Sequence, residues 1–484
     1  GGGVMRINEI VWGDDSAEKD PALLEYFVTS DSFARLRAKS KSIAIGRKGS
    51  GKSALRRKLQ EEFGSQSDTY VVNLSPKYNS IRAILNDADL AEKFGKEVFF
   101  QHTWLRQILL DCLCVIGHSA RGSYAGGSVE FARSIANELQ RTSKDLVENI
   151  SDILSRIRAR AGSIGELGIA VEKELRNVAE ADALEFHLKE LCQSGAKFVV
   201  LIDDLDLGWD NSATANNMLL GLLAATSYLS GSCPAFYSCI FLREDVYALL
   251  ISKTQHSDKY RNVERIRWEK EDLIKVINQR INYNRRLQGL PITGSPFYDV
   301  FPGTLGTSNT DNWLVERTLS RPRELLQLAR YYSEGVPGNS PDDEILKGAE
   351  ANYSSWKLDD LCTEYSNQYP GLIQVFSYWK TKFFRYKYHL NRAELDEMML
   401  AILAEVALNE AWFNSLAEDI DIDAFLRVLY EIGFIGDFVL GGQGGSKTFY
   451  SYSDRHEPRF EEVQVHPCFR KAVNTVERIR SRGA

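Results

Sequence analysis

Eight consecutive residues, Gly46 to Ser53, have the types and spacing needed to hold a phosphate chain. They fit the pattern G-x-x-x-x-G-K-[ST], in which a glycine-rich turn lets the backbone approach phosphate oxygens without a Cβ in the way. In such a loop the Lys52 ammonium reaches the β- and γ-phosphates and the Ser53 hydroxyl ligates Mg²⁺. The residues expected to contact the nucleotide are Gly46, Arg47, Lys48, Gly49, Ser50, Gly51, Lys52 and Ser53.

Two adjacent acids, Asp203 and Asp204, follow the apolar run Phe198 to Ile202. A buried parallel strand that ends in acids places them at the carboxyl edge of its sheet, where such folds bind nucleotide. We expect Asp203 to hold Mg²⁺, directly or through water, and Asp204 to polarise the attacking water. A solvated acidic turn explains the acids alone, but not their occurrence together with the phosphate loop.

Two arginines are candidates for contact with the γ-phosphate. Arg243 ends a third apolar run, Phe236 to Leu242, and Arg323 lies in the first turn of a helix that Pro322 opens. A cation at either place can stabilise the charge on the transferred phosphoryl group. For each of them an ordinary surface position remains an equal alternative.

The elements needed to position these side chains can be read from the apolar pattern. Strands are expected at 42–45, 69–74, 198–202, 236–242 and 263–268, with a helix directly after the loop. A helix is expected around Pro21 to Phe27, and a second near Ser32 to Ala38. Together they predict an α/β fold, a P-loop core with a parallel sheet.

The segment at about 80–190 is predicted to be a helical insertion in this core. Its role is left open between partner binding and structural elaboration. Cys112, Cys114 and His118 fall in one helical stretch without the paired C-x-x-C spacing of zinc sites. We therefore interpret them as core residues and expect no metal there.

The C-terminal third contains helices and then a glycine-tipped hairpin. Residues 307–390 are expected to be helical throughout, and 395–408 and 422–432 are two further helices. Strand-like runs at 434–440 and 448–452 flank Gly441 to Gly445, an order similar to a winged helix. Because Asp423 to Tyr430 carries one arginine among mostly apolar residues, a packing or partner role is favoured over DNA reading.

The overall composition limits the function classes. The chain has 484 residues, 44% of them hydrophobic, and a net charge of −7, so no whole-protein basic field indicates a nucleic-acid binder. Seven cysteines at no framework spacing favour a reducing, cytoplasmic setting. No apolar run reaches 18 residues, so no membrane contact is expected.

The order of the phosphate loop, the I-D-D-L-D strand, the F-L-R-E-D strand end and the S-R-P-R helix resembles the STAND and KAP branches of the AAA+-like P-loop ATPases. The opening A-E-K-D-P-A-L-L-E-Y-F, followed by I-G-R-K-G-S-G-K-S, is similar to a bacterial group of such ATPases. The resemblance covers 17–60 and 198–330. It implies an added strand between the two Walker strands, a helical lid, a winged-helix domain, and Arg323 as the lid sensor.

This resemblance gives the expected domains: a helical lead-in at 5–40, the core at 41–288, a helical lid at 289–390 and a winged-helix-like domain at 391–484. It favours ATP over GTP. Asp204 stands where many relatives carry Glu, and the shorter side chain predicts slow hydrolysis, which suits a switch. Arg261 and Arg265 are candidates for an arginine finger.

The function expected from these features is an ATP- and Mg²⁺-dependent assembly or regulatory switch. It is expected to form a homo-oligomer and to act through a separate effector protein, plausibly in the anti-phage defence that the resembled groups often serve. The alternative is a DNA-associated ATPase that uses the winged-helix-like domain.

Overall fold

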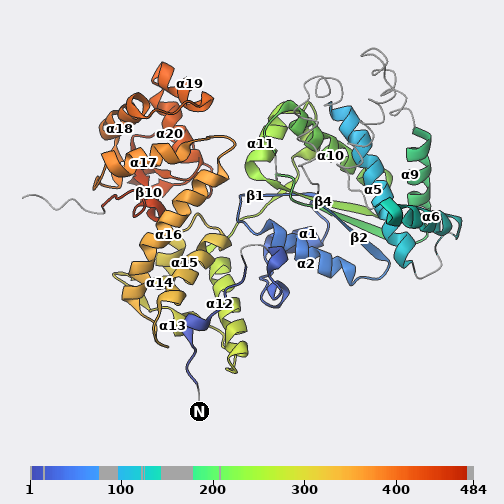
Figure 1. Cartoon of the computed structure of the whole chain (residues 1–484), viewed down its shortest axis with the longest axis horizontal. Coiled ribbons are helices and arrows are strands. Elements are labelled where there is room, and N and C mark those ends of the chain that lie inside the picture. Colours follow the sequence, from blue (N-terminus) through green and yellow to red (C-terminus); the bar gives the residue numbers. More distant parts are fainter. Residues whose placement is uncertain are drawn as a thin grey trace, which may run out of the picture. The chain divides into compact units, whose positions relative to one another are not determined.

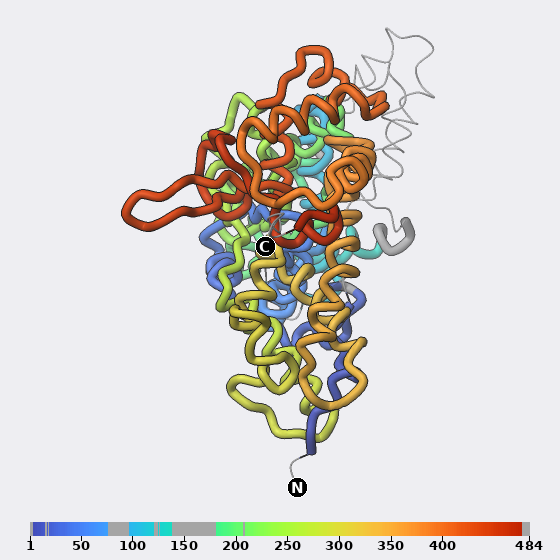
Figure 2. The backbone as a smooth tube through the Cα atoms, turned by 90° about the vertical axis from the view of Figure 1, so that its left-hand side faces the viewer, coloured from blue at the N-terminus to red at the C-terminus, as the bar shows by residue number. Residues whose placement is uncertain are grey.

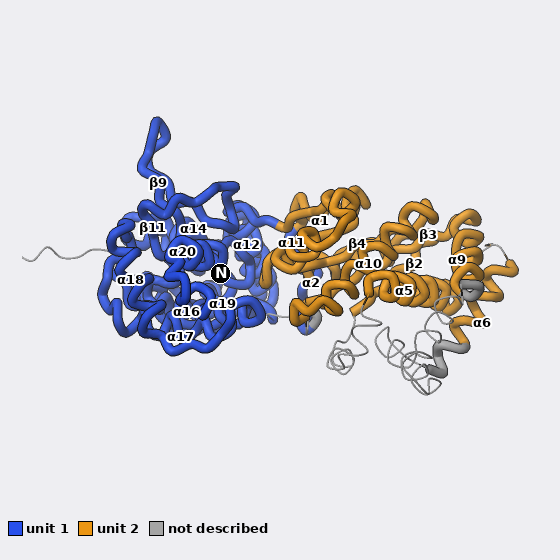
Figure 3. The backbone as a smooth tube through the Cα atoms, turned by 90° about the horizontal axis from the view of Figure 1, so that it is seen from above, with its two compact units in different colours: residues 1–15, 19–28, 267–484 blue, residues 16–18, 29–266 orange. Residues whose placement is uncertain are grey.

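The computed structural model describes residues 3–14, 17–75, 96–120, 124, 126–142, 178–206 and 209–476. The chain forms two compact units (Figure 3). Unit 1 contains 1–15, 19–28 and 267–484, and unit 2 contains 16–18 and 29–266. None of the helices within the described ranges is long and apolar enough to cross a lipid bilayer.

Unit 2 is built on a five-stranded parallel sheet. Its strand order is β2 (Thr69–Leu74), β3 (Lys197–Ile202), β4 (Phe236–Arg243), β1 (Ile43–Gly46) and β5 (Val263–Arg265). β4 therefore lies between β1, which leads into the phosphate loop, and β3, which leads into the acids. This confirms the predicted P-loop fold with an additional strand.

Helices cover both faces of this sheet (Figure 1). One face carries α1 (Asp31–Arg37) and α2 (Lys52–Gly64), and the other carries α5 (Glu97–Ser119) and α10 (Ala213–Ser232). α6 (Gly126–Thr142) and α9 (Val178–Gln193) pack against α5, and α11 (Glu244–Lys253) follows β4. This cover explains why β3 and β4 are apolar along almost their whole length rather than alternating.

The described part of the predicted insertion is helical. α5 buries Trp104, Ile108 and Leu113 in the core of unit 2, and Cys112 lies among them. α5 is thus an integral layer of the fold, with the indole of Trp104 donating to the Met218 carbonyl of α10 at 3.0 Å. Residues 76–95 and 143–177, which make up much of the predicted insertion, lie outside the described residues.

Unit 1 is mainly helical with a small antiparallel sheet. Its helices are α12 (Lys270–Leu287), α13 (Phe297–Val300), α14 (Thr310–Glu316), α15 (Pro322–Gly335), α16 (Asp343–Glu364), α17 (Leu372–Lys382), α18 (Arg392–Glu405), α19 (Ala411–Asp419) and α20 (Ile422–Glu431). The sheet has the order β10 (Gly445–Phe449), β9 (Ile435–Gly442), β11 (Glu462–Val465) and β8 (His389–Asn391), and β6 (Thr304–Leu305) pairs with β7 (Ser308–Asn309). The hairpin of β9 and β10 extends away from the body of this unit (Figure 2).

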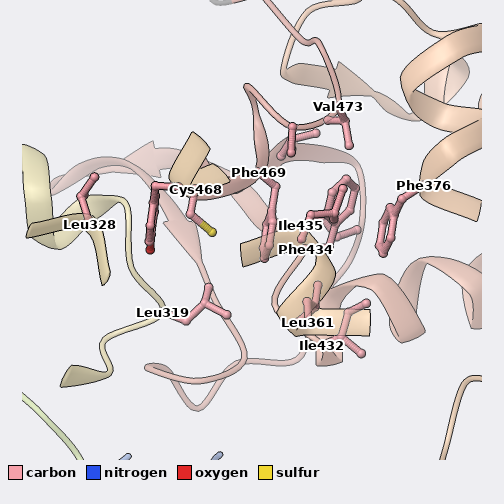
Figure 4. Close-up of a cluster of buried hydrophobic side chains, with 14 of the residues drawn as sticks. Leu319, Leu328, Leu361, Phe376, Ile432, Phe434, Ile435, Cys468, Phe469 and Val473 are labelled. Atoms are coloured by element: carbon pink, nitrogen blue, oxygen red, sulfur yellow. The ribbon is translucent and has the colours of Figure 1, made fainter. Parts of the chain in front are cut away.

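One hydrophobic core runs through the whole of unit 1. It joins Leu328 of α15 and Leu361 of α16 to Phe376 of α17, Phe434 and Phe469 (Figure 4). The core therefore crosses the predicted boundary at 390, and the segments predicted to be a lid and a winged-helix-like domain share one compact unit.

The border between the units also differs from the predicted one. It lies after Ile266, whereas the core was expected to extend to residue 288. The reason is that α12 buries Leu273, Ile277 and Ile281 in the core of unit 1. Part of the predicted lead-in, with Trp12, packs there as well.

Several local predictions need correction. The helix expected at Pro21 to Phe27 is only a 3-10 turn, η3 (Leu23–Glu25), because the Asp20 carboxylate accepts the Ala22 amide and the Tyr26 hydroxyl. The second strand of the hairpin ends at Phe449, since the chain turns at Tyr450 to Ser453. Residues 307–390 are not helical throughout, because they include β7 and the start of β8.

Candidate functional site

The phosphate loop connects β1 to α2, as its sequence predicts. Gly49 (φ 79°) and Gly51 (φ 90°) adopt left-handed conformations, and Gly51 is the N-cap of α2. A Cβ on Gly46 would lie 2.3 Å from the Ser50 hydroxyl oxygen, so a side chain cannot fit there. The loop thus directs the free amides at the start of α2 toward one point, the arrangement that binds phosphate.

Lys52 is the first residue of α2, and its ammonium lies over the loop. It donates to the backbone carbonyls of Gly46 at 3.1 Å and Arg47 at 3.2 Å. These contacts hold a positive charge at the loop, where a β- or γ-phosphate oxygen would accept the same protons.

Ser53 and Asp203 provide a pair of oxygen atoms suited to Mg²⁺. The Ser53 hydroxyl donates to Asp203 Oδ2 at 3.0 Å. Both atoms are hard oxygen donors, so these residues fit the cation.

Asp203 is a buried carboxyl with only 4% of its surface exposed. Burial raises its pKa above the usual value, and the neighbouring charge of Asp204 acts in the same direction. The Asp204 amide, which donates to Asp203 Oδ1 at 2.8 Å, and the cations Lys52 and Arg56 oppose that rise. A bound divalent cation would oppose it further, because it stabilises the ionised form.

Asp204 adopts a left-handed backbone conformation with φ 61°. Its carboxylate accepts a hydrogen bond from Ser75, the residue that follows β2. β2 and β3 are neighbours, and Leu74 pairs with Ile202, so Ser75 and the acids leave the same edge of the sheet. The sequence reasoning missed Ser75, although its place directly after a predicted strand was a usable signal.

Arg56 was also missed. Its Nε lies 3.5 Å from Asp203 Oδ2, and its Nη1 donates to the Asn73 side-chain oxygen at 3.2 Å. The signal for it was spacing, because residues three apart on a helix share a face and Arg56 lies three positions after Ser53. The guanidinium offsets part of the charge of the buried carboxylate.

Arg243 lies beside the phosphate loop. Its Cα pairs with that of Gly46 across the parallel strands β4 and β1. The guanidinium binds the Asp245 carboxylate through two hydrogen bonds, of 3.1 and 2.6 Å. Its position is next to the site, and a contact with phosphate would require it to share or exchange this partner.

Arg323 belongs to unit 1, in the first turn of α15. Its guanidinium pairs with Asp360 at 2.8 Å and lies 5.2 Å from the Trp356 ring centre. The two finger candidates also have acidic partners, since Arg265 pairs with Glu244 at 2.7 Å and Arg261 with Asp258 at 3.4 Å.

Comparison with known protein families finds a match to the FunZ-associated C-terminal helical domain over residues 271–362. This range runs from α12 into α16, entirely within unit 1. The chain is also 23% identical over 509 aligned positions to the transposon gamma-delta 80.3 kDa protein of Escherichia coli (strain K12). That alignment covers 96% of this chain and 67% of the relative.

Among solved structures, the ORC1 protein of Aeropyrum pernix in complex with DNA is similar with a TM-score of 0.37 and 11% identity. The alignment covers 95% of this chain and 96% of that one. CDC6P of Pyrobaculum aerophilum has a TM-score of 0.33 and 13% identity, over 96% of this chain and 97% of that one.

Proposed function

We propose that this chain is an ATPase of the AAA+-like P-loop type that hydrolyses ATP slowly and acts as a nucleotide-driven switch. The observation that carries the proposal is the hydrogen bond of 3.0 Å between Ser53 and Asp203. This pair lies beside a phosphate loop whose backbone carbonyls accept hydrogen bonds from the Lys52 ammonium. The added strand β4 between β1 and β3 supports the same type.

In the proposed reaction, water attacks the γ-phosphorus, the bond from that phosphorus to the β,γ-bridging oxygen breaks, and ADP leaves with the electron pair. Asp204 orients the water and accepts its proton, which then passes to the phosphate product. Lys52 and the loop amides hold the β- and γ-phosphates. Ser53 and Asp203 would hold Mg²⁺, which would neutralise charge on the β- and γ-phosphate oxygens.

Hydrolysis is proposed to be slow because Asp204 is a short base that already accepts a hydrogen bond from Ser75. That contact restrains the carboxylate near the end of β2, and aspartate reaches less far than the glutamate of many related ATPases. A long-lived ATP state suits a switch. We propose Arg243 and Arg323 as the residues that respond to the γ-phosphate, with Arg323 as the lid sensor that the resemblance to the STAND and KAP branches implies.

The nucleotide site is tested with Lys52→Ala, using a fluorescent ATP analogue and the full chain. Affinity should fall about 30-fold or more, since losing one partner of a buried charge pair costs about 2–5 kcal/mol. Lys58→Ala is the matched control, because Lys58 lies on the same helix and pairs with Glu61 at 3.1 Å. Unchanged affinity in Lys52→Ala would reject the site.

The catalytic role of Asp204 is tested separately with Asp204→Asn. Turnover should fall about 100-fold, the typical contribution of a general base, while nucleotide affinity stays the same. Equal turnover in the wild type and in Asp204→Asn would show that Asp204 is not the general base. That result would not contradict the proposed nucleotide-binding site.

The biological role is part of the same proposal. A switch without a visible nuclease or protease motif requires a separate effector protein, and we propose that assembly of this chain controls it, in anti-phage defence. The alternative of a DNA-associated ATPase receives little support from α20, since Arg427 pairs with Glu457 and acids lie at its start, Asp421 and Asp423.

A further inference from the structure

The amino-terminal edge of the parallel sheet in unit 2 carries a groove of about 560 Å³. The link from α1 to β1 contributes Lys39 and Lys41, and the first residue of β3 contributes Lys197. Its polar lining also includes Ser40, Ser42, Ser230 of α10 and Asn262, just before β5. We call this feature the amino-edge groove.

The groove is positively charged, and none of the described residues that line it is acidic. In the described part of the chain, no ion pair neutralises Lys39, Lys41 or Lys197. The Lys41 ammonium donates to the neutral side-chain oxygen of Asn262. The pKa of Lys39 is lowered, first by partial burial of its ammonium and then by the like charge of Lys197 on the same groove. An anion bound near both lysines would offset these like charges.

Lys39 also has an unfavourable, left-handed backbone conformation. It follows α1 with φ 62°, and its amide donates to the Leu36 carbonyl at 3.0 Å. This is the left-handed position after a helix that glycine fills best. The chain has a lysine there, with its ammonium 5.5 Å from the Phe63 ring centre. The strained position therefore places a charge in the groove where folding alone would favour glycine.

We propose that the amino-edge groove binds the phosphodiester backbone of a nucleic acid. Lys41 lies just before β1 and Lys197 begins β3, strands that β4 separates, so the charges spread over roughly 10 Å, two strand spacings. This distance is larger than a single phosphate group, and it fits several successive phosphates of a nucleic-acid backbone. Lys39 and Lys197 are exposed, and exposed cations hold one small anion weakly, whereas several phosphates together gain affinity from counterion release.

The groove is independent of the nucleotide site. The phosphate loop begins at the carboxyl end of β1, and the groove lies at the amino ends of β1, β3 and β4. Phe236 and Tyr237, its aromatic lining residues, are buried, so no ring is free to stack on a base. Binding is therefore directed at the backbone and does not depend on base sequence.

The test measures binding of a short labelled DNA strand and its duplex to the full chain without nucleotide, between about 50 and 200 mM salt. The variant combines Lys39→Gly, Lys41→Met and Lys197→Ala. Its slope of log K against log salt should be shallower by about 2 to 3, because about 0.7–0.9 is lost per phosphate contact. Lys253→Ala, an exposed lysine at the end of α11, is the control and should keep the slope.

Three outcomes would overturn the proposal: an unchanged slope in the triple variant, an equal loss in Lys253→Ala, or lysine-dependent binding of inorganic tripolyphosphate without binding of nucleic acid. Lys39→Gly alone should keep or raise thermal stability, which separates loss of charge from misfolding. Retained binding of the ATP analogue by the triple variant distinguishes this groove from the nucleotide site.

Discussion

At the scale of single residues, the charge on Asp203 is the centre of the candidate site. It is compensated by the Ser53 hydroxyl and by the cations Lys52 and Arg56. A carboxylate that is buried this deeply requires compensation, because burial without partners favours the neutral acid. The pKa of Asp203 is nevertheless raised, so these groups offset only part of the effect of burial.

A buried histidine in unit 1 makes stability depend on pH. His466 Nδ1 accepts the Cys468 amide at 3.1 Å, so in the neutral ring Nε2 carries the proton and donates to the Tyr452 hydroxyl at 2.9 Å. Burial lowers the pKa of His466 to about 3, and the charge of Arg470 adds to the effect. The folded protein therefore holds the neutral form.

The pH prediction follows from this shift. Between about pH 6.5 and 3 the unfolded chain binds a proton that folded His466 does not, so the free energy of unfolding should fall by up to about 1.4 kcal/mol per pH unit as pH drops. Above pH 6.5 the contribution is complete and constant. Urea unfolding of His466→Gln against pH should lack this slope, and the exposed His256→Gln should retain it. Identical slopes in all three proteins would contradict the assignment.

At the scale of elements, α5 and α10 pack closely at a glycine. A Cβ on Gly221 of α10 would lie 2.6 Å from the Gln101 amide nitrogen and 2.8 Å from a backbone carbon of Phe100. Backbone atoms cannot move aside as a flexible side chain can. The glycine therefore sets the distance between the two helices.

Gly221→Ala should lower the free energy of unfolding by about 1–3 kcal/mol, the usual cost of overpacking. Gly231→Ala is a matched control on the same helix, since nothing lies within 4 Å of the place that its methyl group would take. It should be neutral or raise stability by up to about 1 kcal/mol, because alanine favours helix. The urea unfolding midpoints of the two variants measure these changes in stability. Equal midpoints would show that α5 moves to accommodate the methyl group of Gly221→Ala.

A network of buried ion pairs joins α15 to α16. The Arg321 guanidinium, at the N-cap of α15, binds Glu324 of α15 and Glu364 of α16, each at 2.7 Å. The fully buried Lys357 ammonium also binds Glu324 at 2.7 Å. This network ties the first turn of α15, where Arg323 lies, to α16. The response of Arg323 to the γ-phosphate that we propose would depend on this support.

At the scale of the whole molecule, the switch proposal predicts a change in assembly. Light scattering with Mg²⁺ and a non-hydrolysable ATP analogue should show a larger discrete species than ADP gives, since the γ-phosphate is the only difference between the two states. Lys52→Ala should keep the ADP-state mass with both nucleotides. An identical mass for the wild type in both states would contradict an assembly switch.

The sequence by itself determined the phosphate loop and the main strands of the sheet. Gly46 to Ser53 form a contiguous motif whose strand, turn and helix depend only on neighbouring residues. β3 and β4 are buried on both faces, so they appear as continuous apolar runs. Because the carboxyl ends of parallel strands meet at one edge, the pairing of Ser53 with Asp203 could be expected as well.

Only the tertiary structure decided which surfaces meet across long distances in the chain. It brings Arg56 to Asp203, places α12 in unit 1, and gathers Lys39 and Lys197 into one groove. It also forms the short strands β8 and β11, which carry too few apolar residues to be recognised alone. These features depend on packing and strand pairing between distant segments, and no local pattern of residues encodes them.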